Sequence, residues 1–408
     1  MTGSRRGTYD MAVVGAGIVG LAFARELLIR RPDTRLVVID QTEAVAPHQT
    51  SHNSGVIHGG IYYTPGSLKA RLCVEGSGLM EEFCEANGIA YERVGKLIVA
   101  LRPEELPRLD ALELRGRANG TPGLRRITGS EIQDVEPEAQ GIAALHAPKT
   151  GVVDYAAVAR AIERELRAKG VDFELGRRVR SVSRKGDKTT LNLGTTEIRT
   201  NAATLCAGLW SDRLAVSAGM SKDPRILPFR GAYLHLAPQH SGVVRGMVYP
   251  VPNPALPFLG VHITKHVDGH VSLGPTAMLV LSRDGYNPLR IHPRDAAEIA
   301  LWPGSWLMAK RLWRTGVREL HTAVSRKTLL EACAAYVPSL RGMEIERASS
   351  CGVRAQAVNR RGELVDDFVI SDSPGVTDVR NAPSPAATSS FAIARYLVDR
   401  LEGRPDQA

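Results

Sequence analysis

The stretch YDMAVVGAGIVG, residues 9–20, decides the fold. Its first half is an apolar run typical of a buried strand, and residues 18–29 have the apolar spacing of a helix that ends near Pro32. Residues 35–40 (RLVVID) form a second apolar run that predicts another buried strand. A strand, a helix and a strand in this order predict an α/β fold with a doubly wound parallel sheet of the Rossmann type.

The three glycines of this stretch stand where a bound pyrophosphate would need them. Gly15 allows a tight turn, Gly17 lets the backbone approach a phosphate, and Gly20 permits close packing of helix and sheet. The start of the helix would face the phosphates, and Asp40 can accept hydrogen bonds from both ribose hydroxyls of an adenosine. A glycine-rich turn alone is weak evidence, but strand, helix and acid in register predict a bound dinucleotide.

The rest of the chain helps to choose the dinucleotide. No second GxGxxG motif lies between a strand and a helix, and Gly76 and Gly78 fall within a helical pattern. A single N-terminal motif, followed late in the chain by segments that look like cofactor contacts, favours FAD over NAD, because a flavin needs contacts along its whole length.

The composition is that of a soluble globular chain: 408 residues, of which 43% are apolar and 23% charged, enough for about two domains. It excludes disordered and fibrous proteins. The net charge of +9 suits an anionic small molecule, an acidic membrane surface or nucleic acid. Because the basic residues are scattered and no zinc-finger or RNA-binding motif occurs, we expect no nucleic-acid partner.

The cysteines and the longest apolar runs bear on the compartment. The five cysteines form no CxxC pair and are odd in number, which favours a reducing, cytoplasmic setting. The apolar run at residues 11–24 is interrupted by glycines and reads as a strand entering a helix rather than as a signal peptide. The run at residues 246–263 contains four prolines, so we expect no membrane-spanning helix there.

The loop QTSHNSGVIHGGIYYTPGSLK, residues 49–69, resembles the corresponding loop of the L-2-hydroxyglutarate dehydrogenases (also called oxidases). These belong to a broader group of FAD oxidoreductases that includes glycine oxidase and D-amino-acid oxidase. Further matching segments extend over nearly the whole chain, at residues 95–99, 228–233, 249–252, 257–262, 352–357 and 381–389.

The resemblance implies a discontinuous FAD-binding domain with an inserted substrate domain built largely of antiparallel sheet. The sequence agrees, since a helical pattern at residues 155–169 precedes a strand-like run at 170–175, and residues 203–208 read as a buried strand that ends in a glycine turn. The expected ranges are 7–90, 150–215 and 345–404 for the FAD-binding domain and 91–149 and 216–344 for the substrate domain, with a helical insertion around 294–340.

Cofactor contacts follow from the first motif and from the resemblance. The segment 381–388 leads into a helix at 389–401, whose free N–H groups could face the flavin N1–C2=O edge, although a plain helix cap is the alternative. The expected contacts are Gly15, Gly17, Ile18, Val19, Gly20, Asp40, Gln41, Thr50, Ser51, His52, Asn53, Ser54, Gly55, Val179, Ala207, Gly208, Pro383, Ser384, Pro385, Ala386, Ala387 and Thr388.

Oxidation of a 2-hydroxy acid sends a hydride to the flavin and the hydroxyl proton to a base whose pKa lies near the working pH. Histidine is the natural base. His58 and His262 occur in glycine-flanked segments and are the candidates, and an imidazole hydrogen-bonded to backbone is the alternative for each. His48 and His52 could join His58 at a metal, but the segment offers no carboxylate or thiol, so we expect no metal site.

The carboxylate next to the hydroxyl needs a planar fork of donors, which arginine provides. Arg354 occupies the Gly-x-Arg position where the related amino-acid and glycine oxidases bind the substrate carboxylate, although Ala355 replaces their proline. An ion pair is the alternative for Arg354, and Arg230 could be a structural strut. Candidates for a second recognition element of a five-carbon dicarboxylate are Arg230, Tyr249, Tyr62 and Lys69.

The predicted function is FAD-dependent oxidation of L-2-hydroxyglutarate to 2-oxoglutarate, with electrons passing to a quinone, to the respiratory chain or to oxygen. A different α-hydroxy or α-amino acid is the alternative, because Thr276 and Ser282 stand where the family usually has Asn and Lys. A non-catalytic flavoprotein is a third hypothesis, which Arg354, His58 and His262 disfavour.

Aromatic and basic residues gather in the expected helical insertion. A tryptophan stripe beside cations could rest on a membrane interface, at the inner face of the membrane, and deliver electrons to a quinone there; a buried core stripe is the alternative. The residues concerned are Trp302, Trp306 and Trp313, with Lys310, Arg311 and Arg314.

Overall fold

The computed structural model describes residues 8–253 and 259–404. Pro257 and Phe258, which belong to one of the matching segments, lie outside the described residues. The chain divides into two compact units. Unit 1 is formed by the described residues of Met1–Ser51, Tyr155–Leu227 and Ala355–Ala408, and unit 2 by those of His52–Asp154 and Pro228–Arg354.

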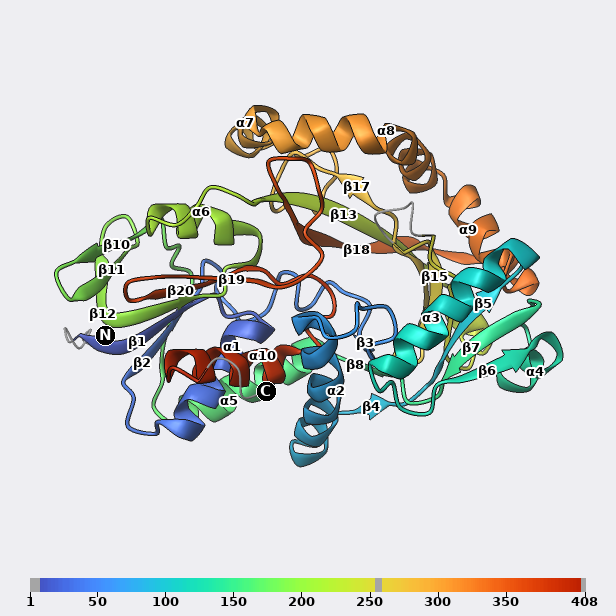
Figure 1. Ribbon diagram of the computed structural model, residues 1–408, viewed down its shortest axis with the longest axis horizontal. Helices are drawn as coiled ribbons and strands as arrows, with labels where there is room; N and C mark the ends of the chain where they lie inside the picture. The colour runs from blue at the N-terminus through green and yellow to red at the C-terminus, as the bar shows by residue number, and fades with distance from the viewer. Residues whose placement is uncertain (1–7, 254–258, 405–408) are drawn as a thin grey trace. The chain divides into compact units, whose positions relative to one another are not determined.

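Unit 1 contains a sheet in which the strand order is β10-β11-β12-β1-β2-β9, with β20 also paired to β12 and β19 paired to β20 (Figure 1). The pairs β1/β2, β1/β12, β2/β9 and β12/β20 are parallel. β2 is buried throughout, as expected for a strand covered on both faces. The strands are β1 (Tyr9–Val14), β2 (Leu36–Ile39), β9 (Asp172–Glu174), β10 (Ser181–Lys185), β11 (Lys188–Asn192), β12 (Glu197–Leu205), β19 (Val369–Ser373) and β20 (Val376–Asn381).

Helices pack on this sheet. α1 packs against both α5 and α10, and α6 packs against β10 and β20 (Figure 1). An ion pair between Arg25 and Glu165, with 2.6 Å between Nε and Oε2, joins α1 to α5. The helices of unit 1 are α1 (Ile18–Arg30), α5 (Tyr155–Ala168), the short 3-10 helix η2 (Gly208–Trp210), α6 (Ser211–Ser217) and α10 (Ser390–Leu401).

Unit 2 contains a larger, mostly antiparallel sheet of order β17-β13-β16-β15-β14-β5-β7-β6, with β18 beside β13, and a small sheet β3-β8-β4. β14 and β5 are parallel to each other. The strands are β3 (Val56–Ile57), β4 (Tyr91–Glu92), β5 (Lys96–Ala100), β6 (Arg125–Thr128), β7 (Ala143–Ala147), β8 (Gly151–Val153), β13 (Arg225–Leu236), β14 (Met247–Pro250), β15 (His262–Lys265), β16 (Val271–Gly274), β17 (Met278–Leu279) and β18 (Ile345–Val358).

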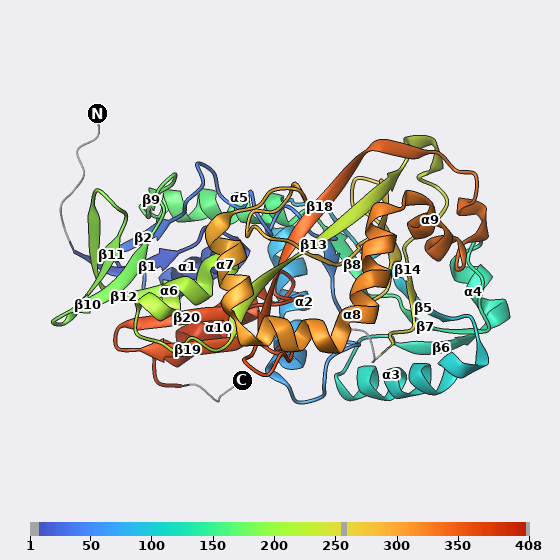
Figure 2. The same cartoon turned by 90° about the horizontal axis from the view of Figure 1, so that it is seen from above.

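Both sequence segments of unit 2 contain helices. α7, α8 and α9 follow one another in the expected helical insertion (Figure 2). The helices are α2 (Leu68–Ala86), η1 (Pro103–Glu105), α3 (Leu106–Ala118), α4 (Gly129–Val135), η3 (Pro238–His240), α7 (Pro293–Leu301), α8 (Pro303–Val324), α9 (Arg326–Ala334) and η4 (Pro338–Leu340). Among the described residues, no helix is both long and apolar enough to cross a bilayer.

Successive side chains of β5 point alternately into two hydrophobic clusters of unit 2. Leu97 and Val99 join a cluster that includes residues of α9, whereas Ile98 and Ala100 join a cluster that includes residues of α3 and β14. Because side chains alternate along a strand, Lys96 lies on the same face as Ile98. This placement turns the one charged residue of β5 toward the second cluster.

The prediction of an α/β fold with a second, antiparallel sheet is confirmed. The packing units differ in detail from the expected domains, because residues 52–90 pack within unit 2 and the later boundaries fall near residues 227 and 355. The assignment of residues 52–90 to cofactor binding stays a prediction.

Candidate functional site

The glycines of the first motif fit a close-packed turn. Gly15 has φ +114°, and a Cβ there would lie 2.2 Å from the carbonyl oxygen of Cys206. A Cβ on Gly20 would lie 2.0 Å from the carbonyl oxygen of Gly15. Both contacts are with backbone, which cannot move aside, so only glycine fits. Gly17 precedes α1 and provides no side-chain cap for it.

Asp40 lies against this turn. Its Oδ2 accepts a hydrogen bond from the N–H of Ala16 at 2.7 Å, while Oδ1 accepts from the N–H and the hydroxyl of Thr42 at 2.9 and 2.7 Å. The Thr50 hydroxyl accepts from the N–H of Ile18 at 3.0 Å, which satisfies one donor in the first turn of α1. The acid and the glycine turn therefore form one structure, which suits the adenosine and pyrophosphate of a dinucleotide.

Two further segments of unit 1 reach the same region. The N–H of Ala46 donates to the carbonyl of Ala16 at 3.0 Å, which brings the segment before Thr50 to the glycine turn. A Cβ on Gly208 would lie 2.7 Å from Oε1 of Gln49, so the turn after β12 approaches that segment closely. Val179 is buried in the core cluster to which Ala207 is packed.

The C-terminal segment of unit 1 is buried and polar. The hydroxyls of Tyr155 and Thr388 are 2.9 Å apart and hydrogen-bonded. Ser389 precedes α10, and its side chain makes no capping hydrogen bond to that helix. Among the described residues, the buried hydroxyls of Ser389 and Ser390 have no hydrogen-bond partner. Such groups suit a polar ligand at the start of α10, and the flavin end of FAD would be one.

The expected cofactor contacts do not all belong to one unit. Residues 52–55 lie in unit 2, with His52 packed on Tyr286 at 4.6 Å between ring centroids. A Cβ on Gly352 would lie 2.2 Å from the carbonyl oxygen of His52, so β18 needs a glycine there. The remaining contacts lie in unit 1: Gly15, Gly17, Ile18, Val19, Gly20, Asp40, Gln41, Thr50, Ser51, Val179, Ala207, Gly208, Pro383, Ser384, Pro385, Ala386, Ala387 and Thr388.

In unit 2 a second set of residues, here named the buried polar cluster, comprises His58, Tyr62, Lys69, Lys96, Tyr249 and His262. The rings of Tyr249 and His262 are stacked with their centroids 3.8 Å apart. Nζ of Lys96 lies 4.1 Å from the ring centroid of Tyr249 and 5.5 Å from that of Tyr62. Positive charges at Lys96 and Lys69 act electrostatically on His58.

Burial dominates the titration of this cluster. It lowers the pKa of His58 well below the usual 6.5, and the charge of Lys96 lowers it further. It lowers the pKa of His262 to about 3 and that of Lys96 from 10.5 to about 7. It raises the pKa of Tyr62 well above 10. Without cofactor and substrate, the apolar and cationic environment thus holds the pKa of both imidazoles below the range expected of a general base, and the assignment of either histidine as the base stays a prediction.

His262 has a defined orientation. Its Nδ1 lies 3.1 Å from the carbonyl oxygen of Gly260, so Nδ1 carries the proton and Nε2 holds a lone pair. His58 is half-buried, and its carbonyl oxygen accepts a hydrogen bond from Sγ of Cys73 at 3.3 Å. Both imidazoles are thus neutral and able to accept a proton.

The two arginine candidates have different surroundings. Arg354 acts electrostatically on Tyr233, and Tyr233 acts in turn on Tyr249 of the buried polar cluster. Nε of Arg230 instead donates to the carbonyl oxygen of Tyr286 at 2.9 Å. This contact agrees with the alternative that Arg230 is a structural residue. An electrostatic link through Tyr233 thus connects Arg354 with the cluster, and one donor of Arg230 is used by the backbone.

Sequence reasoning missed Lys96 as a site residue. A usable signal was present, since Lys96 begins the otherwise apolar strand KLIVA and a lysine is rarely buried without a partner. Only the pairing of β5 with β14 brings it near Tyr249.

The other expectations concern residues that differ from the family pattern or resemble metal ligands. The hydroxyl of Thr276 accepts from the N–H of Ala232 at 3.1 Å, and the hydroxyl of Ser282 donates to Asp284, so both side chains have structural roles. His48 packs on the ring of Trp210. The three histidines of the loop thus have different neighbours, and no metal-ligating group of three residues occurs within residues 8–253 and 259–404.

Comparison with known proteins identifies relatives along the full chain. A family model described as "FAD dependent oxidoreductase" matches residues 10–400. "L-2-hydroxyglutarate dehydrogenase" of Indibacter alkaliphilus is 40% identical over 94% of this chain and 96% of its own. The mitochondrial L-2-hydroxyglutarate dehydrogenases of Nematostella vectensis and Homo sapiens are 43% and 42% identical, each over 97% of this chain and over 91% and 89% of their own.

Solved structures show the same fold at lower identity. L-alpha-glycerophosphate oxidase of Mycoplasma pneumoniae with FAD bound has a TM-score of 0.78 at 22% identity and covers 97% of this chain and 95% of its own. Glycine oxidase of Geobacillus kaustophilus has a TM-score of 0.73 at 20% identity with the same coverage. The chain belongs to the FAD dependent oxidoreductase family and, within it, to the L-2-hydroxyglutarate dehydrogenase group.

Proposed function

We propose that the chain is an FAD-dependent enzyme that oxidises L-2-hydroxyglutarate to 2-oxoglutarate. The observation that carries this proposal is identity of 40–43% to L-2-hydroxyglutarate dehydrogenases over nearly the whole length of both chains. The second support is chemical, since unit 1 contains a dinucleotide cradle and unit 2 a buried set of cations and imidazoles suited to an acid.

Residues of unit 1 would hold the cofactor. Gly15 and Gly17 would face the pyrophosphate, Asp40 the ribose, and the start of α10 the flavin ring. FAD, when bound, supplies the acceptor for the hydride equivalent of the substrate. Everything else in the reaction is binding, orientation and proton transfer by this chain's side chains.

Residues of unit 2 would hold the acid. Arg354 offers two parallel N–H donors to the carboxylate beside the hydroxyl and so fixes its orientation. The hydroxyl proton passes to an imidazole, either to Nε2 of His262 or to His58. A bound dianion stabilises the protonated imidazole, which raises the low pKa values of the ligand-free protein toward the working pH.

The direct test uses the visible spectrum. The purified protein is expected to carry an oxidised flavin spectrum that bleaches under anaerobic conditions when L-2-hydroxyglutarate is added. A panel of D- and L-hydroxy and amino acids serves as the comparison. Bleaching by another acid but not by L-2-hydroxyglutarate would move the assignment to that acid, and no bleaching by any acid would favour the non-catalytic flavoprotein.

We also propose that the enzyme is cytoplasmic and contacts the inner face of an anionic membrane, where a quinone or the respiratory chain takes the electrons; oxygen is the alternative acceptor. Five side chains in α7, α8 and the segment before them support the membrane contact, because they are large, apolar and 60–86% exposed: Leu289, Ile291, Leu301, Trp306 and Trp313. Exposed cations accompany them at Lys310, Arg311 and Arg314. Such a mixture suits a lipid interface.

One member of the tryptophan stripe does not belong to this surface. Trp302 is only 6% exposed, so it is a core residue. The expected stripe included all three tryptophans, whereas α7 ends at Leu301 and α8 begins at Pro303, with Trp302 between them. Trp302 therefore lies in the break between helices and faces inward, as the core alternative required.

Sedimentation with lipid vesicles tests the membrane contact. The wild-type protein is expected to sediment with phosphatidylglycerol vesicles and not with phosphatidylcholine vesicles. Trp306→Ser/Trp313→Ser should abolish this without changing anaerobic bleaching. Leu114→Ser is the matched control, since Leu114 is 70% exposed but lies on α3. Equal sedimentation of the double variant and the control would refute the contact.

A further inference from the structure

Lys96 is a buried cation whose place follows from the register of the sheet. It is the first residue of β5, where it pairs with Ala147 of β7 and Met247 of β14, and it is 2% exposed. Its side chain is among the largest fully buried ones in the described residues. A lysine in this position cannot reach bulk water with its ammonium group, so its charged form needs compensation by neighbouring groups or by a ligand, and without it the amine loses its proton more readily.

The protein itself supplies little compensation. Two tyrosine rings face Nζ, at 4.1 Å for Tyr249 and 5.5 Å for Tyr62, and a ring quadrupole offsets only part of a desolvated charge. Within the described residues, Lys96 has no hydrogen bond or ion pair, and no carboxylate contributes to its electrostatic environment. The titratable groups on which Lys96 acts include His58 and His262, which are themselves cationic when they take up a proton, and Cys73 acts on Lys96 in turn.

A neighbouring group has an unmet hydrogen bond as well. The hydroxyl of Tyr62 is buried and, among the described residues, has no partner. A buried hydroxyl without a partner costs free energy unless a ligand or water satisfies it. Lys96 and Tyr62, with Nζ 5.5 Å from the centroid of the tyrosine ring, thus offer a charged donor and a neutral donor in one cluster, which is the donor set that a carboxylate needs.

We propose that Lys96 binds the distal carboxylate of the substrate, with Tyr62 as the second donor, and so makes the enzyme selective for dicarboxylates. The inference rests on the proposed function and deepens it, because Arg354 accounts for the carboxylate beside the hydroxyl and leaves the other without a partner. Lys69 is a less suitable partner, since its Nζ lies over a different ring, that of Tyr63, at 5.0 Å. Arg230 donates to the backbone of Tyr286 instead.

The first test compares two substrates that differ only at the distal end. L-2-Hydroxyglutarate carries a carboxylate there and L-2-hydroxypentanoate a methyl group. In Lys96→Met the ratio of kcat/KM for the two substrates should fall by about 50-fold, because a charge-assisted hydrogen bond is lost from one substrate only. Lys149→Met, which changes an exposed lysine of unit 2, should leave the ratio unchanged.

The second test needs no turnover. Glutarate, which lacks the hydroxyl, should raise the melting temperature of the wild-type protein and of Lys149→Met but not that of Lys96→Met, and pentanoate should raise none of them. Ligand-free Lys96→Met should melt at the same or a higher temperature than wild type, because it removes an uncompensated buried charge. If Lys96→Met does not fold, Tyr62→Phe gives the answer, with a fall of about fivefold in the substrate ratio.

Two outcomes would overturn the proposal. Equal loss of kcat/KM for both substrates would assign Lys96 to the end they share, and unchanged stabilisation of Lys96→Met by glutarate would remove Lys96 from carboxylate binding. Failure of the proposed function looks different, since the wild-type protein would then not bleach with L-2-hydroxyglutarate. The glutarate arm would still decide the role of Lys96 in that case.

Discussion

Arg354 and Arg230 show how neighbouring contacts decide what an arginine can do. The guanidinium of Arg230 is held by the carbonyl oxygen of Tyr286, so part of its donor fork serves the fold. Arg354 instead acts on Tyr233, which is electrostatically coupled to Tyr249 and hence to the buried polar cluster. The sequence could name Arg354 from the Gly-x-Arg motif, but it could not separate the two arginines by their contacts.

Replacing Arg354 tests the planar fork. Arg354→Lys should keep the flavin spectrum, because the dinucleotide cradle belongs to unit 1, but raise KM for L-2-hydroxyglutarate about 100-fold, since an ammonium group cannot make two parallel bonds. Anaerobic titration of the flavin absorbance measures both effects. Arg125→Lys is the control, because Arg125 is an exposed arginine of unit 2, the unit that contains Arg354. Unchanged kinetics in Arg354→Lys would remove Arg354 from the site.

Lys96 also makes stability depend on pH. Burial lowers its pKa from 10.5 to about 7, so between these values the unfolded chain binds a proton that the folded chain releases. The free energy of unfolding therefore rises with pH between about 7 and 10.5, by at most about 1.4 kcal/mol per pH unit. This gain is lost as the pH falls back to about 7. Melting temperatures of the ligand-free protein should rise between pH 7.5 and 9.

The same experiment includes its control. Lys96→Met should lose this rise, whereas Lys149→Met should keep it. Above pH 9 the buried thiol of Cys73, whose pKa burial raises to about 12, begins to act in the opposite direction, so the measurement stops there. A rise of equal slope in Lys96→Met would assign the pH dependence to another group.

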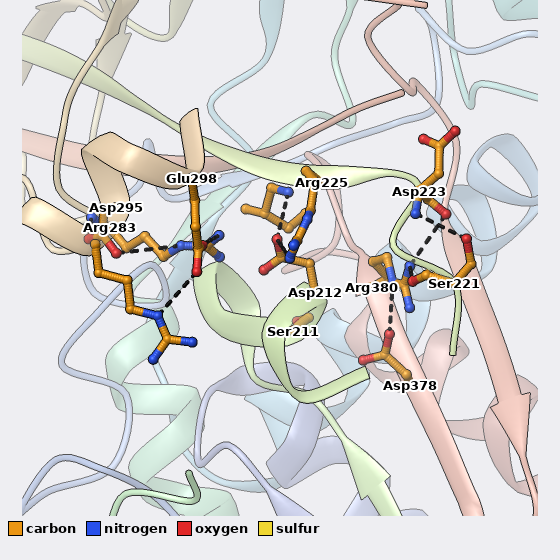
Figure 3. Close-up of polar contacts among 12 residues, drawn as sticks. Ser211, Asp212, Ser221, Asp223, Arg225, Arg283, Asp295, Glu298, Asp378 and Arg380 are labelled. Atoms are coloured by element: carbon orange, nitrogen blue, oxygen red, sulfur yellow. Dashed lines mark hydrogen bonds and ion pairs between the residues drawn. The ribbon is translucent and has the colours of Figure 1, made fainter. Parts of the chain in front are cut away.

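At the scale of elements, buried ion pairs fix helices and loops to the sheets. Arg283 is 3% exposed; its backbone N–H donates to Asp295 at 2.8 Å and its Nη2 donates to Glu298 at 3.2 Å, which ties the segment after β17 to α7 (Figure 3). In unit 1, Arg380 of β20 pairs with Asp378 at 3.2 Å and donates to the carbonyl oxygen of Ser221 at 2.7 Å (Figure 3). The hydrogen bond from Arg380 to Ser221 holds the loop after α6 against β20.

The Arg380–Asp378 pair can be dissected by a double-mutant cycle. Arg380→Met should cost about 3 kcal/mol, because it leaves a buried carboxylate without its partner. Burial already raises the pKa of Asp378 to about 7, so protonation relieves the variant at low pH and the loss should be larger at pH 8.5 than at pH 6. Chemical denaturation at the two pH values measures the loss.

The cycle closes with the single variant Asp378→Asn and the double variant Asp378→Asn/Arg380→Met. Removing both charges should recover much of the stability lost in Arg380→Met and abolish its dependence on pH. A double variant no more stable than Arg380→Met would show that Arg380 acts through the carbonyl oxygens of Ser221 and Asp223 rather than through the carboxylate.

Over the molecule as a whole, local sequence patterns predicted strands and helices well, but they did not predict which distant strands pair. The first strand, helix and strand, residues 9–40, follow from periodicity and glycine placement, which are local properties. The lysine at the start of the apolar strand KLIVA is a local signal, but the surroundings of Lys96 depend on β14, about 150 residues later. The break at Trp302 depends on Pro303, which a count of spacing alone ignores.

The discontinuous make-up of unit 1 has a consequence for synthesis on the ribosome. α1 packs on two helices that come much later in the sequence, α5 and α10. Until the ribosome has made α10, the apolar surface of α1 that α10 covers stays open to water or to a chaperone. Loss of α10 should therefore yield an aggregating protein rather than a weaker enzyme.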